Sequence, residues 1–296
     1  MCRLVFALAS LAACLVASAN PLYVYMPDST NNRLVLFDPF NGDVVNPNYF
    51  ALAGGTPFHA IQVGNEIWVS EQVGDRVSRW SLTGTPLGAI TGALDNIRGM
   101  ALVDSTVYVA NSGTLNSAPG AAIRMFSTTG ADLGHFATPA SGSPFAILGF
   151  QGGLLVASST ANDDVHRYSL TGVSQGTFHN STNLNFAQQM AIAANGDVLV
   201  AGFSSNNIVR LDPTTGSLIS SFPASGARGV FQLGNGNILW SSGAGAHIYD
   251  VTLGTSTLIY SGGGRHFGLG AVPEPGTMLA LAAGLGAIGI RRRRKR

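Results

Sequence analysis

One phrase recurs six times in this chain of 296 residues, and it restricts the fold more than any other feature. Each copy is an apolar run followed by Asp or Ser, a short spacer and a glycine. The closing glycines are Gly42, Gly84, Gly130, Gly172, Gly216 and Gly254. A period of about 40 residues indicates repeated supersecondary units that bury their apolar faces against one another.

Four short strands are predicted for each repeat. A run rich in Val, Ile, Tyr or Trp, such as residues 67–69, precedes the phrase, and a strand such as residues 85–90 follows its glycine. A further apolar strand follows a Gly- or Pro-rich loop, as at residues 59–61. The glycine supplies the positive φ of a tight hairpin. Four antiparallel strands in about 40 residues are typical of a propeller blade, so residues 20–271 are predicted to form an all-β, six-bladed β-propeller with almost no helix.

The phase of the repeat predicts how the ring closes. The body begins with the second type of strand, at Leu22, and ends with the inner type, at residues 266–270. The last blade should therefore combine a C-terminal inner strand with three N-terminal strands. This joint would fix the two ends of the ring without a disulfide, because the only cysteines are Cys2 and Cys14, near the N-terminus.

The repeats resemble those of NHL-type propellers, a group that also includes streptogramin lyase-like and YVTN-type repeats. The resemblance rests on residues 31–38 (Asn-Asn-Arg-Leu-Val-Leu-Phe-Asp) and residues 74–77 (Gly-Asp-Arg-Val), and the Arg is missing at Asn207-Ile208. It implies the propeller fold for the whole body. It implies no single activity, because these propellers include enzymes, protein binders and secreted proteins without an assigned role.

Residues 1–19 have the pattern of a secretory signal peptide. Arg3 forms a short positive region, residues 4–16 are almost wholly apolar, and residues 17–19 are a small-residue cleavage site that leaves Asn20 as the new N-terminus. The alternative is a lipoprotein signal that ends at Cys14. The pattern predicts export through the Sec pathway, and a chain that begins at Asn20 contains no thiol.

The C-terminal segment, residues 272–296, has three parts. It begins with Val272, Pro273, Glu274 and Pro275, continues with a Gly-punctuated apolar run at residues 278–290, and ends with a basic cluster. The cluster consists of Arg291, Arg292, Arg293, Arg294, Lys295 and Arg296. The apolar run would span about 20 Å as a helix, less than the hydrocarbon core of about 30 Å. The basic cluster should stay on the cytoplasmic side, and its long side chains can snorkel, so a short transmembrane helix is predicted.

This three-part order resembles the PEP-CTERM sorting signal of Gram-negative bacteria. The resemblance implies that an exosortase, a membrane transpeptidase-like enzyme, recognises the Pro-Glu-Pro residues as a substrate motif. It further implies an exported protein that the tail anchors transiently in the inner membrane. Processing would then leave the protein on the outer surface or in the extracellular space, in species that make exopolysaccharide and biofilm.

Charged residues make up only 10% of the chain, and their distribution argues against a nucleic-acid partner. Between the N-terminal segment and the C-terminal tail, the sequence contains nine arginines and fourteen acidic residues, so the body lacks the basic surface of a nucleic-acid-binding protein. No nucleophile elbow, phosphate loop or metal-binding motif is present, and no cofactor or metal is expected. The acidic pair Asp163 and Asp164 is expected in a solvated loop. Trp68, Trp80 and Trp240 are expected in the blade cores, with a sugar-stacking platform as the alternative.

Superposing the repeats produces one candidate binding site. Five polar residues fall at the start of the innermost strands, with Phe145 in the sixth place: His59, Arg98, Gln189, Arg228 and His266. In a propeller these positions surround the mouth of the central channel. The arginines could bind an anion there, such as a carboxylated sugar. The alternative is that the five side chains plug the channel and satisfy loop carbonyls and water.

Three functions fit these observations. The first is a non-enzymatic surface or matrix protein whose propeller binds a glycan or another exported protein. The second is a lyase or hydrolase at the channel mouth, where lyase chemistry at His59 and His266 would resemble that of streptogramin lyase. No Glu occupies a matching repeat position, so no catalytic residue is assigned. The third is a structural spacer without a ligand.

Overall fold

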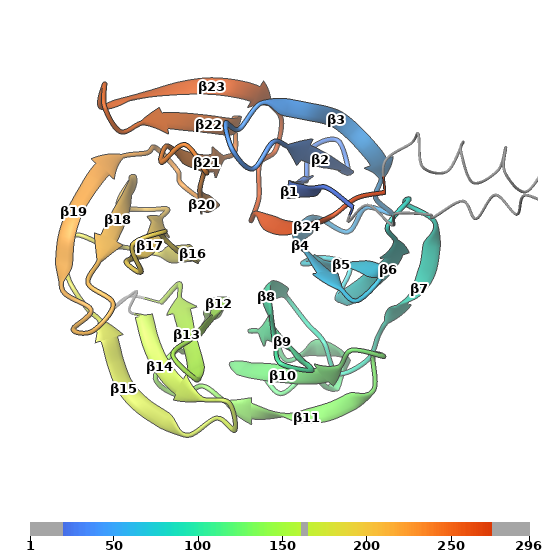
Figure 1. Cartoon of the computed structure of the whole chain (residues 1–296). Coiled ribbons are helices and arrows are strands. Elements are labelled where there is room, and N and C mark those ends of the chain that lie inside the picture. Colours follow the sequence, from blue (N-terminus) through green and yellow to red (C-terminus); the bar gives the residue numbers. More distant parts are fainter. Residues whose placement is uncertain (1–19, 161–164, 274–296) are drawn as a thin grey trace, which may run out of the picture. The chain divides into compact units, whose positions relative to one another are not determined.

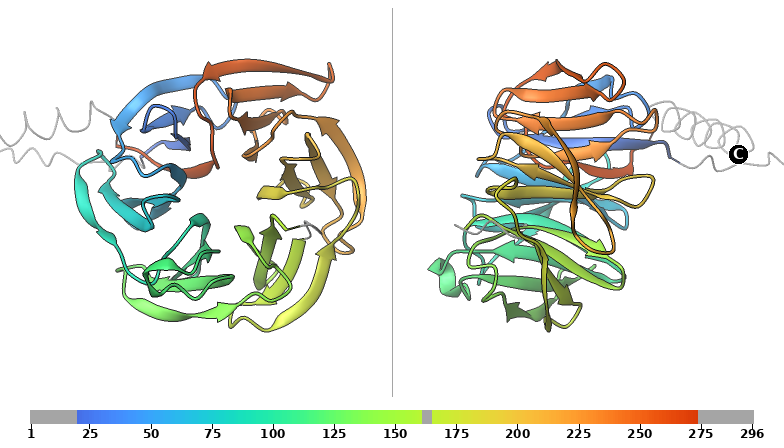
Figure 2. Two further views of the ribbon diagram at one scale, coloured as in Figure 1. Left: turned by 180° about the vertical axis from the view of Figure 1, so that it is seen from behind. Right: turned by 90° about the vertical axis from the view of Figure 1, so that its left-hand side faces the viewer.

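The computed structural model describes residues 20–160 and 165–273, which form a ring of six β-sheets (Figure 1). Each sheet has four antiparallel strands, from an inner strand beside the central axis to an outer strand at the rim. Figure 2 shows the ring from behind and from the side. The predicted six-bladed propeller is confirmed, and the one helical element of the described residues is a 3-10 turn at Leu115–Ser117.

From the inner to the outer strand, the first blade contains β24 (Gly268–Ala271), β1 (Leu22–Asp28), β2 (Arg33–Phe37) and β3 (Val44–Ala51). The second blade contains β4 (Pro57–Val63), β5 (Glu66–Glu71), β6 (Arg76–Ser81) and β7 (Pro86–Ile90). The third blade contains β8 (Ile97–Val103), β9 (Thr106–Asn111), β10 (Ala122–Ser127) and β11 (Asp132–Ala137). The fourth blade contains β12 (Pro144–Phe150), β13 (Gly153–Ser158), β14 (Val165–Ser169) and β15 (Ser174–His179). The fifth blade contains β16 (Ala187–Ile192), β17 (Val198–Gly202), β18 (Asn207–Leu211) and β19 (Leu218–Pro223). The sixth blade contains β20 (Val230–Gln232), β21 (Ile238–Ser242), β22 (Gly245–Asp250) and β23 (Thr255–Ser261).

The repeated phrase folds as the hairpin between the third and fourth strands of each blade. All six closing glycines adopt a positive φ, and in the first blade Gly42 has φ +82°. There the Gly42 N–H donates to the carbonyl of Asp38 at 2.9 Å, while the Asp38 side chain accepts the N–H groups of Phe40 and Asn41. The Asp or Ser of the phrase therefore satisfies the turn backbone, and the glycine allows its conformation.

The core lies between the blades. Each of the six clusters of buried apolar side chains combines residues of two neighbouring sheets. Trp68 lies between the second and third blades, Trp80 between the first and second, and Trp240 between the fifth and sixth, all buried as expected. This distribution makes stability a property of the closed ring, because a single blade has nothing to cover its two apolar faces.

The ring closes as the repeat phase predicts. Strand β24 pairs antiparallel with β1, with Leu22 opposite Ala271 and Tyr25 opposite Gly268. The Tyr25 hydroxyl donates to the carbonyl of Ala271 at 2.9 Å. Val272, the first residue of the predicted sorting tail, is buried in the apolar cluster of the first and second blades. The chain therefore packs against the ring up to the edge of the Pro-Glu-Pro motif.

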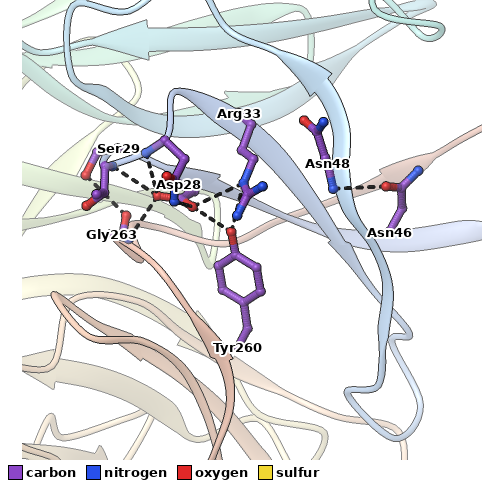
Figure 3. A network of polar contacts seen from close by, with 9 residues as sticks. Asp28, Ser29, Arg33, Asn46, Asn48, Tyr260 and Gly263 are labelled. Carbon is purple, nitrogen blue, oxygen red and sulfur yellow. Dashed lines mark hydrogen bonds and ion pairs between the residues drawn. The ribbon is translucent and has the colours of Figure 1, made fainter.

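A second contact across the seam centres on Asp28, which is fully buried (Figure 3). Its carboxylate accepts the Tyr260 hydroxyl at 2.5 Å and the Gly263 N–H at 2.9 Å, both from the C-terminal side of the seam. It also accepts the Arg33 Nε–H at 3.3 Å. Buried charges are tolerated only when they are paired and hydrogen-bonded, and these donors meet that condition.

Several sequence predictions fall outside residues 20–160 and 165–273. They are the signal peptide, the loop acids Asp163 and Asp164, Glu274 and Pro275 of the sorting motif, the apolar run at residues 278–290 and the basic cluster that follows it. Within the described part of the chain, no helix is long and apolar enough to cross a membrane.

Candidate functional site

The six inner strands surround the central axis and run in the same direction along it, because every blade repeats the same antiparallel order (Figure 1). We name the end of the channel where these strands begin the entry end, and the opposite end the exit end. Neighbouring inner strands approach closely: a Cβ on Gly99 would lie 2.7 Å from the Cα of Ala146. The Arg-Gly pattern at residues 98–99 thus places a long side chain beside a position that must remain small.

Three arginines gather at the entry end, and we call Arg98, Arg228 and Arg265 the arginine mouth. Arg98 lies in β8, whereas Arg228 and Arg265 lie two and three residues before β20 and β24. All three interact electrostatically with His266, which lies between Arg265 and Phe267 in the chain. The sequence prediction included Arg98 and Arg228 but missed Arg265.

Aromatic rings support the arginine mouth. The guanidinium of Arg98 lies 4.5 Å from the ring centre of Phe145, and that of Arg265 lies 5.1 Å from Phe58. Arg228 lies 5.7 Å from the ring of Phe203. Such cation–π contacts stabilise a cation without neutralising its charge.

The guanidinium groups have few polar partners. Arg98 donates to the Ser143 hydroxyl at 3.0 Å, and its Nε is buried without a partner among the described residues. Arg265 donates to the Ser29 hydroxyl at 2.8 Å. None of the arginines in the mouth forms an ion pair with a carboxylate of residues 20–160 or 165–273.

Electrostatics in the arginine mouth reflect this lack of counter-charge. Burial lowers the pKa of Arg98 to about 10, and burial together with the charge of Arg228 lowers that of Arg265 to about 10. Burial also lowers the pKa of Arg228. All three groups remain cations at neutral pH, in an environment that favours the approach of an anion.

Two serines fix the backbone that carries these arginines. Ser70 donates to the carbonyl of Arg98 at 2.5 Å and accepts the His59 N–H at 3.2 Å. In the sixth blade, Ser241 donates to the carbonyl of Arg265 at 2.6 Å and accepts the Gly229 N–H at 2.8 Å. Each serine thus joins the inner segment of its own blade to that of the next through two hydrogen bonds.

The other predicted residues, His59, Gln189 and His266, form a septum across the channel, centred on the backbone of Phe267. Its carbonyl accepts His59 Nε2–H at 3.0 Å and Gln189 Nε2–H at 2.5 Å, and its N–H donates to Gln189 Oε1 at 2.8 Å. His59 Nδ1 accepts the Met100 N–H at 3.0 Å. These contacts are those expected of side chains that plug the channel.

The two histidines of the septum differ in their hydrogen bonding. His59 uses both ring nitrogens, and burial lowers its pKa to about 4, so it is neutral at physiological pH. His266 lies 5.4 Å from it, measured between ring centres, and is fully buried. Neither nitrogen of His266 has a hydrogen-bond partner among the described residues. Burial, the neighbouring His59 and the arginine mouth lower its pKa well below the usual value.

Beyond the septum, the channel widens into a cavity of about 610 Å³ toward the exit end. We call this cavity the exit funnel. His59, Gln189 and His266 are among its lining residues. Its walls are mainly apolar and include Met100, Leu102, Leu148, Ile192, Phe231 and Leu269. Arg98, Arg228 and Arg265 do not line it, so the predicted collar divides into an arginine mouth and a septum.

Sequence reasoning could have found part of what it missed. Arg265 directly precedes His266, and Arg228 and Arg98 occupy comparable places in their own repeats. A superposition of the repeats that allowed a shift of one residue would therefore have included Arg265. Among the aromatic supports, Phe145 already occupies the sixth place of the superposed repeats, whereas Phe203 had no such signal. Phe186 and Phe203 lie in loops, and only the ring brings Phe186 within 5.1 Å of Phe145, measured between ring centres.

The chain is similar to known families and structures in two separate ways. Residues 271–295 match the family model of the PEP-CTERM protein-sorting motif. The match supports export, processing by an exosortase and a membrane-anchored tail before processing. No curated protein matches the chain.

Solved structures match the propeller. A protein of unknown function from Bacteroides caccae is 16% identical over 86% of this chain and 100% of its own, with a TM-score of 0.64. A chain of a nidogen/laminin complex is 12% identical over 84% and 98%, with a TM-score of 0.68. Virginiamycin B lyase from Staphylococcus aureus is 13% identical over 79% of each chain, with a TM-score of 0.58. At such identities these likenesses show the fold alone.

Proposed function

We propose that this chain is an exported, non-enzymatic binding protein whose arginine mouth holds a carboxylate of an acidic extracellular polysaccharide. The observation that carries the proposal is the convergence of Arg98, Arg228 and Arg265 with no ion-pair partner among the described carboxylates. Burying cations without a counter-charge is unfavourable, so an anion that enters the mouth is bound where the protein alone leaves the charge uncompensated.

The chemistry of the mouth suits a carboxylate on a sugar. Guanidinium groups bind carboxylates through two parallel hydrogen bonds, and Arg228 makes no side-chain hydrogen bond to a described residue. The rings of Phe58 and Phe145 lie beneath two of the arginines and reduce their exposure to water. An acidic polymer presents many such carboxylates, so it offers the single arginine mouth many equivalent positions to bind.

The place of action follows from the C-terminal motif. Residues 271–295 match the PEP-CTERM sorting motif, and Val272 is buried in the ring immediately before Pro-Glu-Pro. We propose that an exosortase removes the tail and leaves the folded propeller on the outer surface or in the extracellular matrix of a Gram-negative bacterium. Association with exopolysaccharide or biofilm is part of this proposal.

A propeller lyase is the second candidate, and the proximity of His59 and His266 favours it. A similar fold in virginiamycin B lyase adds to its plausibility. Against it, His59 has both nitrogens engaged, and no described carboxylate orients His266. Replacing both histidines with Ala separates the candidates: turnover of any substrate that is found should disappear if they are catalytic, and persist if they are not.

Binding of the secreted chain to polygalacturonate, with neutral dextran as the comparison, tests the main proposal. We expect salt-sensitive binding to polygalacturonate alone. R98A, R228A and R265A should each weaken it about tenfold or more, because a hydrogen bond to a charged group contributes about 1.5–3 kcal/mol. The matched control is R167A, because Arg167 donates to Gln151 in the turn between β12 and β13 and is not part of the arginine mouth. Equal binding to both polymers, or full affinity in all three variants, would refute the proposal.

A further inference from the structure

We infer that the exit funnel is a second binding site, for a neutral and largely apolar molecule that carries one hydrogen-bonding group at its buried end. The funnel and the arginine mouth lie on opposite sides of the septum. The inference therefore does not depend on the proposed polysaccharide site and can fail or succeed separately.

The volume and lining of the funnel define the size and charge of the ligand. A cavity of about 610 Å³ is in the range of sites that hold drug-sized molecules. No Lys, Arg, Asp or Glu among the described residues lines it. A charged ligand would lose its hydration there without gaining an opposite charge, so the complementary ligand is neutral.

The opening of the exit funnel to solvent is lined by apolar side chains, which favours an apolar ligand. Leu102, Ile192 and Leu269 line it and are 38%, 48% and 44% exposed. They come from three different inner strands, β8, β16 and β24, so their exposed surfaces surround the opening. A ligand that covers them removes apolar surface from water, which is the main source of affinity in such sites.

The septum specifies the polar end. Gln189 and His59 use their side-chain groups on Phe267 and on neighbouring backbone groups. His266 lines the same cavity, is fully buried and has neither ring nitrogen paired within the described residues. A neutral imidazole offers one donor and one acceptor, so the ligand should present a hydroxyl, amine or amide group to it. A buried polar side chain without a partner is unfavourable, and such a ligand relieves that condition.

N-phenyl-1-naphthylamine is a suitable probe, because it is neutral and aromatic, carries a single N–H and fluoresces in apolar surroundings. Titration of the secreted chain should produce a saturable increase with one site per chain. H266F should weaken binding about tenfold, because the ring keeps its contacts with Phe58 and Phe145 but loses its nitrogens. I192D should weaken binding further by placing a charge at the opening, whereas I219D on the outer strand β19 is the matched control.

A second probe isolates the hydrogen bond. 1-Benzylnaphthalene has a similar shape without the N–H, and its affinity should be the same for the native chain and for H266F. R98A, R228A and R265A should leave both probes unaffected, which separates this site from the polysaccharide site. Absence of saturable binding, or equal binding by the native chain, H266F and I192D, would overturn the inference and leave the funnel as a channel for ordered water only.

Discussion

At the scale of single residues, Asp28 shows how one buried charge can hold two ends of a chain together. Its carboxylate accepts hydrogen bonds from Arg33 on the N-terminal side and from Tyr260 and Gly263 on the C-terminal side (Figure 3). Burial raises the pKa of Asp28, but the hydrogen bonds from Asn31, Tyr260 and Gly263 lower it more, so the net shift is downward. The carboxylate is therefore ionised in the folded ring and is stabilised by it.

Replacing Asp28 with Asn should lower the free energy of unfolding by about 3 kcal/mol at pH 7, because the charge-assisted hydrogen bonds are lost and Arg33 loses its partner. Denaturant unfolding measures this difference. A lowered pKa means that the carboxylate stabilises the fold above the unfolded-state pKa of about 3.9, and that this contribution is lost as pH falls through the folded-state value.

The difference in the free energy of unfolding between the native chain and D28N should therefore be largest at pH 7 and become smaller below about pH 4. D43N is the control, because Asp43 is an exposed carboxylate that accepts only the side chain of Asn41. A difference in the free energy of unfolding that does not change with pH would show that Asp28 stabilises the ring through its packing and not through its charge.

At the scale of elements, β24 performs two tasks. It completes the first blade by pairing with β1, and the segment just before it supplies Arg265 to the mouth and His266 to the septum. Gly270 faces Tyr25, and an added Cβ at this position would overlap the Tyr25 ring. A single short strand thus joins ring closure to both candidate sites.

Deleting residues 264–271 should open the ring and lower the melting temperature by at least about 10 °C, or abolish cooperative melting, because the loss exposes two blade interfaces. G270V is a milder variant that should lower the melting temperature by several degrees without removing any strand. A chain that ends at Pro273 is the control and should melt like the native chain. Unchanged melting of the deletion variant would contradict the closure of the ring by β24.

At the scale of the whole molecule, strand pairing, buried hydrogen bonds and packing between the blades hold the described ring together. Both cysteines precede Asn20, so a mature chain that begins there has no disulfide to close the ring. Six apolar clusters between neighbouring blades provide the stability instead. Val272 is buried in the ring and is also the first residue of the Val-Pro-Glu-Pro motif, within residues 271–295 that match the sorting-motif model.

Mass spectrometry of the secreted protein should show a chain that lacks the segment after about Pro275. Replacing Glu274 and Pro275 with Ala should leave the tail intact and keep the protein in the membrane fraction, because the exosortase no longer recognises its substrate. T277A is the control. The same spectra distinguish an N-terminus at Asn20 from a lipid-modified Cys14. Secreted native protein that still contains Arg296 would contradict the sorting proposal.

The fold was predictable because its information is local and repeated. A glycine with positive φ after Asp38 or Ser81 defines a hairpin wherever it occurs, and six copies at one spacing predict six blades. The start of the body at Leu22 in the second strand type also predicted the pairing of β24 with β1. Each of these deductions needs only neighbouring residues and a count.

The candidate site was predictable only in part. The sequence by itself determined the blades, the closure of the ring, the sorting motif and the approximate positions of Arg98 and Arg228. Only the tertiary structure decided that Arg265 joins them, that His59 and Gln189 bond to Phe267, and that His266 lies buried without a partner. The physical reason is that strand pairing depends on local backbone pattern, whereas hydrogen-bond partners and burial depend on distances between residues as far apart as 59 and 267.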